Sequence, residues 1–311
     1  MFPIIPAGTA GASGNKGIFG FGHDGISAYV GVTNIVSNAG VVADDVAAVG
    51  TARGGPGACE YGTDTGLFWG GYAGYPLVAT LNLVSNEGVV ASDAAATTGL
   101  PRKGCGGCDY GGDKGIMGFG WAGVPIGNVG TTNLISNAGV VADDVTAVGN
   151  VRTNVTASEF GGDKGIFFGG YNGGAWYPET NLVSNVGVVA SDVAGVGTLR
   201  YGAPGSRYGT DTCIFAFGYE SVGPAGYLAV SNLVSNTGVV AADQAAVTGT
   251  ARSEGGGCEY GGDKGIMGYG GTGATGCVTI TNLVSTTGVV ATDVAGVGTA
   301  RNAAAGCAWG S

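Results

Sequence analysis

Residues 252–301 have the sequence RSEGGGCEYGGDKGIMGYGGTGATGCVTITNLVSTTGVVATDVAGVGTAR, and similar copies of this stretch follow one another along the whole chain. Each copy has a glycine-rich apolar burst, an NLVS-like segment, a GVVA run, an Asp and an Arg. Counted from one tight turn to the next, the copies begin at Asn15, Asp64, Asp113, Asp163, Asp211 and Asp263. A fixed period of about 50 residues indicates a solenoid, a propeller or an array.

Four short strands are expected within this copy, at 256–260, 265–270, 279–285 and 289–297. Val, Ile, Tyr, Phe and Thr fill them, and Gly, Asn and Ser separate them. No window shows a sustained helical pattern. Four strands per copy fit the blade of a propeller, whereas the coils of a parallel β-helix, the alternative, are usually about half this length. We predict an all-β, six-bladed β-propeller with four-stranded antiparallel blades.

The two ends of the chain complete one copy between them. The tail AAAGCAWGS (303–311) matches GGGCEYGG (255–262), which precedes a second strand, whereas the first copy begins at its second strand. We expect the tail to supply the innermost strand of the blade that holds residues 15–50, because closure removes free sheet edges. Residues 14–311 then form the propeller, and residues 1–13 form an N-terminal arm.

Charge and hydropathy exclude several classes of partner. Net charge is −10, and ten of the twelve basic residues occupy repeat-equivalent positions, which leaves only Lys103 and Arg207. A nucleic-acid surface needs clustered Lys and Arg, so we expect none. No apolar run is long enough for a transmembrane helix, and the first residues lack the basic start of a signal peptide. We therefore expect synthesis in a cytoplasm and no membrane partner.

Two charged series follow the repeat, an Arg in each copy and an Asp eight or nine residues before it. A ring of Arg could clamp an anion. Because the planar guanidinium donates several fixed hydrogen bonds, structural ion pairs or backbone ties are the favoured interpretation. The expected structural residues are Arg53, Arg102, Arg152, Arg200, Arg252 and Arg301, with Asp45, Asp93, Asp144, Asp192, Asp243 and Asp293.

The sequence carries no set of residues that predicts catalysis or cofactor binding. One position on the predicted innermost strand holds Glu60, Asp109, Glu159 and Glu259, with Arg207 and Ala308 in the other two copies. These acids either pair with the Arg series, the favoured alternative, or line a channel that holds a cation. His23 is the only histidine, so no Ser-His-Asp set can be assembled convincingly. We expect no enzyme, no metal and no cofactor.

The loop between the second and third strands differs in every copy, whereas the other turns are nearly constant. Variable loops on a rigid scaffold often carry binding residues. The aromatic candidates are Tyr29, Tyr75, Trp176, Tyr177 and Tyr227, since such rings combine an apolar body with a polar tip. The alternative is that these rings only pack their own loops. The fourth strands form a rim of small apolar residues that suits lateral packing.

The order of Arg, glycine-rich strand and apolar strand ending in two glycines resembles a kelch or galactose-oxidase-type propeller. Arg53, Gly70 and Gly71 stand where that pattern has its Arg and diglycine. The phrases YGGDKGI, TNLVSNTGVVA and VGTAR more closely resemble repeat proteins of marine bacteriophage virions. The resemblance implies a non-enzymatic structural or adhesive component of a phage particle: a tail fibre, a tail tip or a capsid decoration.

Under this interpretation the protein is located in the virion and binds other virion proteins through the arm and the rim. Phe2, Ile4 and Ile5 would anchor the arm. The variable loops would contact a neighbouring protein or a host-surface glycan. The alternative function is a carbohydrate-binding, lectin-type propeller, which predicts aromatics at equivalent loop positions; Tyr75 and Trp176 lack a full set of equivalents. An unrecognised hydrolase on the loop face is a third hypothesis.

Overall fold

The structure is a computed structural model that describes residues 15–47, 49–94, 99–146, 148–221, 226–244, 248–273 and 276–310. The predicted arm, with Phe2, Ile4 and Ile5, lies outside the described residues. Regular structure in the described ranges consists of β-strands. These ranges contain no helix with the length and hydropathy needed to cross a membrane.

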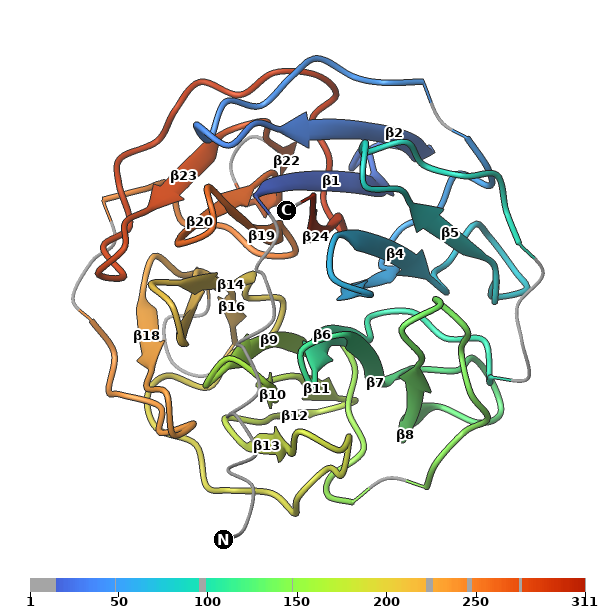
Figure 1. The fold of residues 1–311 in the computed structure, drawn as a ribbon. Helices are drawn as coiled ribbons and strands as arrows, with labels where there is room; N and C mark the ends of the chain where they lie inside the picture. Colours follow the sequence, from blue (N-terminus) through green and yellow to red (C-terminus); the bar gives the residue numbers. More distant parts are fainter. Residues whose placement is uncertain are drawn as a thin grey trace, which may run out of the picture.

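The main strands form six antiparallel three-stranded sheets among the described residues, arranged around a common centre (Figure 1). In each sheet the first strand of a copy pairs with the second, and the second pairs with the third. In this order the sheets are β24 (Ala305–Trp309), β1 (Lys16–His23) and β2 (Tyr29–Val36); β3 (Gly57–Tyr61), β4 (Thr65–Trp69) and β5 (Leu81–Val84); β6 (Gly106–Tyr110), β7 (Lys114–Trp121) and β8 (Asn128–Ile135); β9 (Thr156–Phe160), β10 (Lys164–Phe168) and β13 (Thr180–Val183); β14 (Gly205–Tyr208), β15 (Thr212–Ala216) and β18 (Ser231–Val234); and β19 (Gly256–Tyr260), β20 (Lys264–Gly268) and β23 (Thr281–Val284).

Burial on both faces explains the continuous apolar runs of the middle strands. Leu67, Phe68 and Trp69 of β4 are all fully buried although they follow one another, because β4 has a neighbouring sheet on each side. Leu67 and Trp69 share a cluster with Met117 of β7, and Phe68 packs with Ile18 of β1 on the opposite side. A strand covered on both faces needs no alternation of polar and apolar residues. The core therefore lies between the sheets.

The prediction of a fourth strand per copy is wrong for the described residues. The run predicted at 289–297 touches β23 only through two isolated bridges, at Val290 and Val294. Between them the Asn282 side chain donates hydrogen bonds to the Ala291 carbonyl (2.9 Å) and to Asp293 (2.9 Å). The Asn282 carboxamide thus replaces the backbone hydrogen bonds that a continuous strand pair would form between the two bridges. The same two bridges recur in the other copies.

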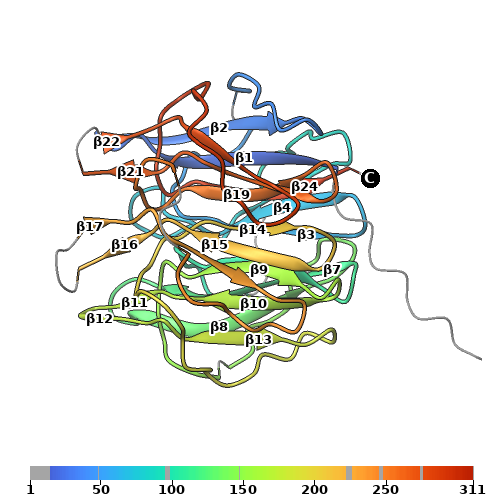
Figure 2. The same ribbon diagram turned by 90° about the vertical axis from the view of Figure 1, so that its left-hand side faces the viewer.

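Short hairpins extend three of the copies on one face of the molecule. They are β11 (Tyr171–Asn172) with β12 (Ala175–Trp176), β16 (Tyr219–Glu220) with β17 (Gly226–Tyr227), and β21 (Gly271–Thr272) with β22 (Gly276–Cys277). Figure 2 shows them side by side along the same edge. They form the variable loops, so these loops share a face. On the other face, Asn137 of one conserved turn donates to Asp113 of another (3.1 Å).

The first strands of the sheets lie against one another around the centre. Each of β3, β6, β9, β14, β19 and β24 contacts the first strand on either side of it. β24 pairs with β1 over Lys16–Gly20, as the sequence match of the tail predicts. Residues just before these strands also join neighbouring sheets: Gly55 N donates to Ala303 O (2.8 Å), Gly104 N to Gly55 O (2.8 Å) and Glu254 N to Gly202 O (2.7 Å).

Candidate functional site

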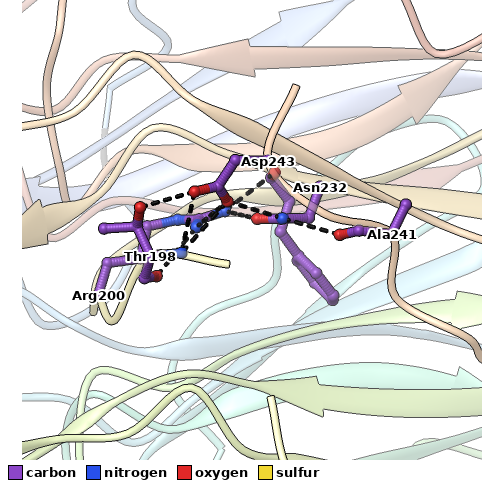
Figure 3. A network of polar contacts seen from close by, with 6 residues as sticks. Thr198, Arg200, Asn232, Ala241 and Asp243 are labelled. Atoms are coloured by element: carbon purple, nitrogen blue, oxygen red, sulfur yellow. Dashed lines mark hydrogen bonds and ion pairs between the residues drawn. The ribbon is translucent and has the colours of Figure 1, made fainter. Parts of the chain in front are cut away.

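The frame of the site is a buried polar network that recurs in each copy (Figure 3). Arg200 is fully buried and donates to the Asn232 side chain and to the Thr198 carbonyl (3.3 Å). Asn232 in turn donates to Ala241 O (3.0 Å) and to Asp243 (2.9 Å). Thr198 donates to Asp243 through both its backbone N–H (3.0 Å) and its hydroxyl (2.6 Å). Most polar groups of the network therefore have partners, as buried polar groups require; Arg200 Nε is an exception and donates no hydrogen bond among the described residues.

Each network belongs to one sheet, and its Arg does not pair with the Asp that lies eight or nine residues before it. Arg53, just before β3, lies 3.8 Å from Asp93, which follows β5 of the same sheet, whereas Asp45, eight residues before Arg53, faces Arg301 (4.0 Å). The other equivalent ion pairs are Arg102–Asp144, Arg152–Asp192 and Arg200–Asp243, at 3.7, 3.5 and 3.7 Å. Arg252 and Asp293 attract each other at the remaining position.

Burial and hydrogen bonding shift the pKa values of these groups. Burial lowers the pKa of Arg53, Arg200 and Arg252 to about 10, which leaves each guanidinium charged at neutral pH. Burial would raise the pKa of Asp243, but hydrogen bonds from Thr198 and Asn232 outweigh it and lower that pKa. Both partners stay ionised, so each pair ties the segment before the first strand of a sheet to the run after its third strand.

The candidate site is a hollow of about 500 Å³ at the centre of the variable-loop face. One repeat position lines it: the residue after the glycine that ends each apolar burst, which is His23, Tyr72, Trp121 and Tyr171 in four of the copies. Each of these residues forms a bridge with the residue that follows a network Arg. The bridges are His23–Asn302, Tyr72–Gly54, Trp121–Lys103 and Tyr171–Thr153, with Tyr219–Tyr201 and Gly271–Ser253 in the remaining copies.

Aromatic rings form two arcs around this hollow. In one arc Tyr29 contacts His23 and Tyr72, with ring centroids 4.9 and 5.5 Å apart. In the other, Tyr201 contacts Tyr171 (5.8 Å) and Tyr219 (5.6 Å). All of these rings are partly exposed. Flat, half-exposed rings offer apolar faces and polar edges to a ligand.

Polar side chains form the floor of the hollow. Each oxygen of the Glu254 carboxylate accepts one hydrogen bond, from Asn154 Nδ2 and from Asn302 Nδ2, both at 3.2 Å. Burial raises the pKa of Glu254, and the positive charge of Lys103 opposes that rise. Lys103 Nζ lies over the rings of Tyr72 (4.7 Å) and Trp121 (5.3 Å). The floor therefore offers amides, one carboxylate and one ammonium group.

The other end of the central axis is narrow and acidic. The acids at the shared inner-strand position line it together with Arg207, which forms ion pairs with Glu159 and with Glu259 (3.3 Å). The favoured interpretation, pairing with the network Arg series, is wrong for Glu159 and Glu259. Burial, reinforced by the charge of Asp109, raises the pKa of Glu60 to about 8. No group of His, Cys, Asp and Glu in the described ranges has an arrangement suited to a metal ion.

The predicted loop aromatics fall into three groups. Tyr29 lines the hollow and contacts a ring of the neighbouring sheet. Trp176 packs on Tyr171 (5.2 Å) and Tyr227 on Tyr219 (5.1 Å), each within its own hairpin. Tyr75 is 76% exposed, and Tyr177 is half-buried without lining the hollow.

Comparison with known proteins provides no family. No protein-family model matches the chain, and no curated protein matches it significantly. What the hollow could bind is therefore inferred from its own residues.

Sequence reasoning missed Tyr72, Trp121, Tyr171 and Tyr201, which build most of the aromatic wall. A signal for three of them was present. The residue after the terminal glycine of the apolar burst is aromatic or His in five of six copies: His23, Tyr72, Trp121, Tyr171 and Tyr219, with Gly271 in the sixth. A repeated aromatic position of this kind is what a lectin-type propeller predicts. In most copies this position lies just before the variable loop, so the variability of the loops does not point to it.

Proposed function

We propose that the chain is a six-bladed β-propeller closed by the C-terminal tail. The sixfold repeat, the pairing of β24 with β1 and the mutual contacts of the six first strands support this. The network in which Thr299 N donates to Asp45 (2.9 Å) also supports closure, because it joins the last copy to the first as Thr198 joins Asp243. Each blade would consist of three strands and an outer run bridged at two points.

The proposed activity is non-enzymatic adhesion, in which the axial hollow binds a saccharide. One observation carries this proposal: a hollow of about 500 Å³ combines half-exposed aromatic rings with amide and carboxylate groups on its floor. Sugar rings stack on aromatic faces, and their hydroxyls need acceptors and donors in fixed places. Hydrolysis would need two carboxyl groups about 5–9.5 Å apart, and Glu254 is the one carboxylate lining the hollow among the described residues.

The proposed location is a phage virion, where the ligand would be a host-surface glycan. The resemblance of the repeat phrases to virion proteins of marine phages supports this. The arm and the rim would attach the protein to neighbouring virion proteins. Among the described residues, the most exposed large apolar residue of the rim in each copy is a valine, 57–65% exposed: Val41, Val89, Val140, Val188, Val239 and Val289. Exposed apolar surface of this kind suits packing in an assembly.

A glycan array tests the adhesive function directly. The wild-type protein should bind a small set of saccharides, and Trp121→Ala and Tyr201→Ala should each weaken binding by about tenfold or more, since central aromatics dominate such interfaces. Tyr75→Ala is the matched control, because this ring is exposed and away from the hollow. Loss of binding in the Tyr75 variant alone would contradict the axial site. Detection in purified particles tests the location.

A further inference from the structure

The two basic residues outside the repeat pattern both line the central axis. Lys103 lines the hollow on the loop face, and Arg207 lines the narrow acidic end. Arg207 has carboxylate partners in Glu159 and Glu259. Lys103 differs: among the described residues no acceptor forms a hydrogen bond or an ion pair with its Nζ. The repeat does not require a cation at this place, because the equivalent residues are Gly54, Thr153, Tyr201, Ser253 and Asn302.

The surroundings of Lys103 leave its ammonium group available toward the hollow. The rings of Tyr72 and Trp121 cover it on two sides, and burial lowers its pKa. Its backbone is fixed by the bridge to Trp121, in which Lys103 N donates to Trp121 O at 3.1 Å. A partly desolvated ammonium with three donors and no acceptor forms a stronger contact with an anion than an exposed lysine does.

We propose that the ligand of the axial hollow is an acidic saccharide, whose carboxylate or sulfate group binds Lys103. This inference rests on the proposed saccharide-binding function. Lys103 and Glu254 give the hollow a positive and a negative group, so they orient the ligand: its anionic group faces Lys103. Its hydroxyls donate to Glu254, whose oxygens have accepting capacity left beyond the bonds from Asn154 and Asn302. Tyr171 and Tyr201 supply the stacking faces that Lys103 does not cover.

Calorimetric titration with matched oligosaccharides tests this inference. The probes are a uronic-acid oligomer, its neutral counterpart of the same linkage and a sulfated counterpart. The wild-type protein should bind at least one acidic form about tenfold more tightly than the neutral form, because a charge-assisted hydrogen bond replaces a neutral one. The preference should decrease as salt rises.

Three variants assign the preference to Lys103. Lys103→Gln should reduce the ratio of acidic to neutral affinity to about one, and Lys103→Arg should retain most of it. The matched control is Lys16→Gln, because Lys16 Nζ also lies over a tryptophan, Trp309, at 4.9 Å. Lys16 begins β1 at the end opposite His23, so its loss should leave the ratio unchanged.

The outcomes separate the inference from the function on which it rests. Equal affinity of the wild-type protein for neutral and acidic forms would overturn the inference and leave saccharide binding intact. A preference that survives Lys103→Gln in a protein with unchanged thermal midpoint would also overturn it. If no saccharide of any charge binds the wild-type protein, the proposed function fails together with the inference.

Discussion

The two ends of the central axis are lined by different parts of the same copies, the inner strands at one end and mainly the residues that precede these strands or follow the second strands at the other, and they differ in shape and chemistry. The loop end is a hollow of about 500 Å³ with aromatic walls and an ammonium group that lacks an acceptor in the described residues. The opposite end encloses about 40 Å³ and places acidic side chains around Arg207. The Arg, Asn and Asp networks do not line either end of the axis; each connects segments of one sheet. Because each sheet has its own network, residues at either end of the axis can vary while the sheets keep these ties.

The largest loss of stability is expected from a substitution in the polar network that recurs in each copy. Arg200→Ala removes the donor to Asn232 and leaves Asp243 without its cation. Removing one partner of a buried ion pair costs about 3–5 kcal/mol; because the Asp243 side chain is 28% exposed, the variant should lose free energy of unfolding near the lower end of that range in urea titrations. Because the substitution destabilises the whole fold, it should disturb the residues at both ends of the axis.

A matched control for this variant is Lys164→Ala. Lys164 also pairs with an aspartate, Asp163, at 2.7 Å, but both side chains are partly exposed, by 43% and 36%. Its loss should leave the denaturation midpoint nearly unchanged, because surface ion pairs contribute little. Equal losses in the two variants would show that the networks do not carry the frame.

A change at the acidic end should have a smaller effect, confined to that end. Arg207→Ala introduces the residue that stands at the equivalent position as Ala308. Glu159 and Glu259 lose their cation but can take up protons, so the cost at neutral pH should stay below that expected for Arg200. Urea unfolding measures the loss, and saccharide affinity at the loop end should remain at the wild-type level. Impaired binding would show that the two ends are coupled.

Stability should also depend on pH through the acidic end of the axis. Burial raises the pKa of Glu60 from 4.5 to about 8 in the folded protein. Between these values the folded state binds more protons than the unfolded state, so stability should fall as pH rises from about 4.5 to about 8. The thermal midpoint should therefore be higher at pH 5 than at pH 8.5, and Glu60→Gln should flatten the difference. A midpoint that rises over this range would contradict the assignment.

Much of the fold could be predicted from the period, whereas the choice of partners in the polar networks could not. The strand predicted at 256–260 matches β19, and the tail pairs with β1 as expected. The fourth strand failed because Asn282 competes for the Ala291 carbonyl, a side-chain effect that strand propensities do not include. The partner of Arg53 is Asp93, about 40 residues away, because three antiparallel strands and the returning outer run bring the segment before β3 and Asp93 to the same end of one sheet.

The candidate site was only partly predictable for a related reason. Variability between copies pointed to Tyr29, which lines the hollow, but also to Tyr75, which does not. Tyr72 and Trp121 occupy a regular position beside the glycines, where the repeat makes them look structural. Glu254 and Lys103 belong to different copies. That both line the same hollow follows only from the fold, which brings these copies together at the axis.

The pairing of β24 with β1 has a consequence for biosynthesis. The Trp309 indole donates to Gly17 O at 3.1 Å, across 292 residues of chain. On a ribosome, β1 therefore leaves the exit tunnel long before its inner neighbour exists, and one edge of β1 stays unpaired until residues 305–309 have been synthesised. An unpaired edge is a template for strands of other molecules. Crowded nascent chains can exchange their last strands at this seam, so domain-swapped oligomers are the misfolded species to look for during expression.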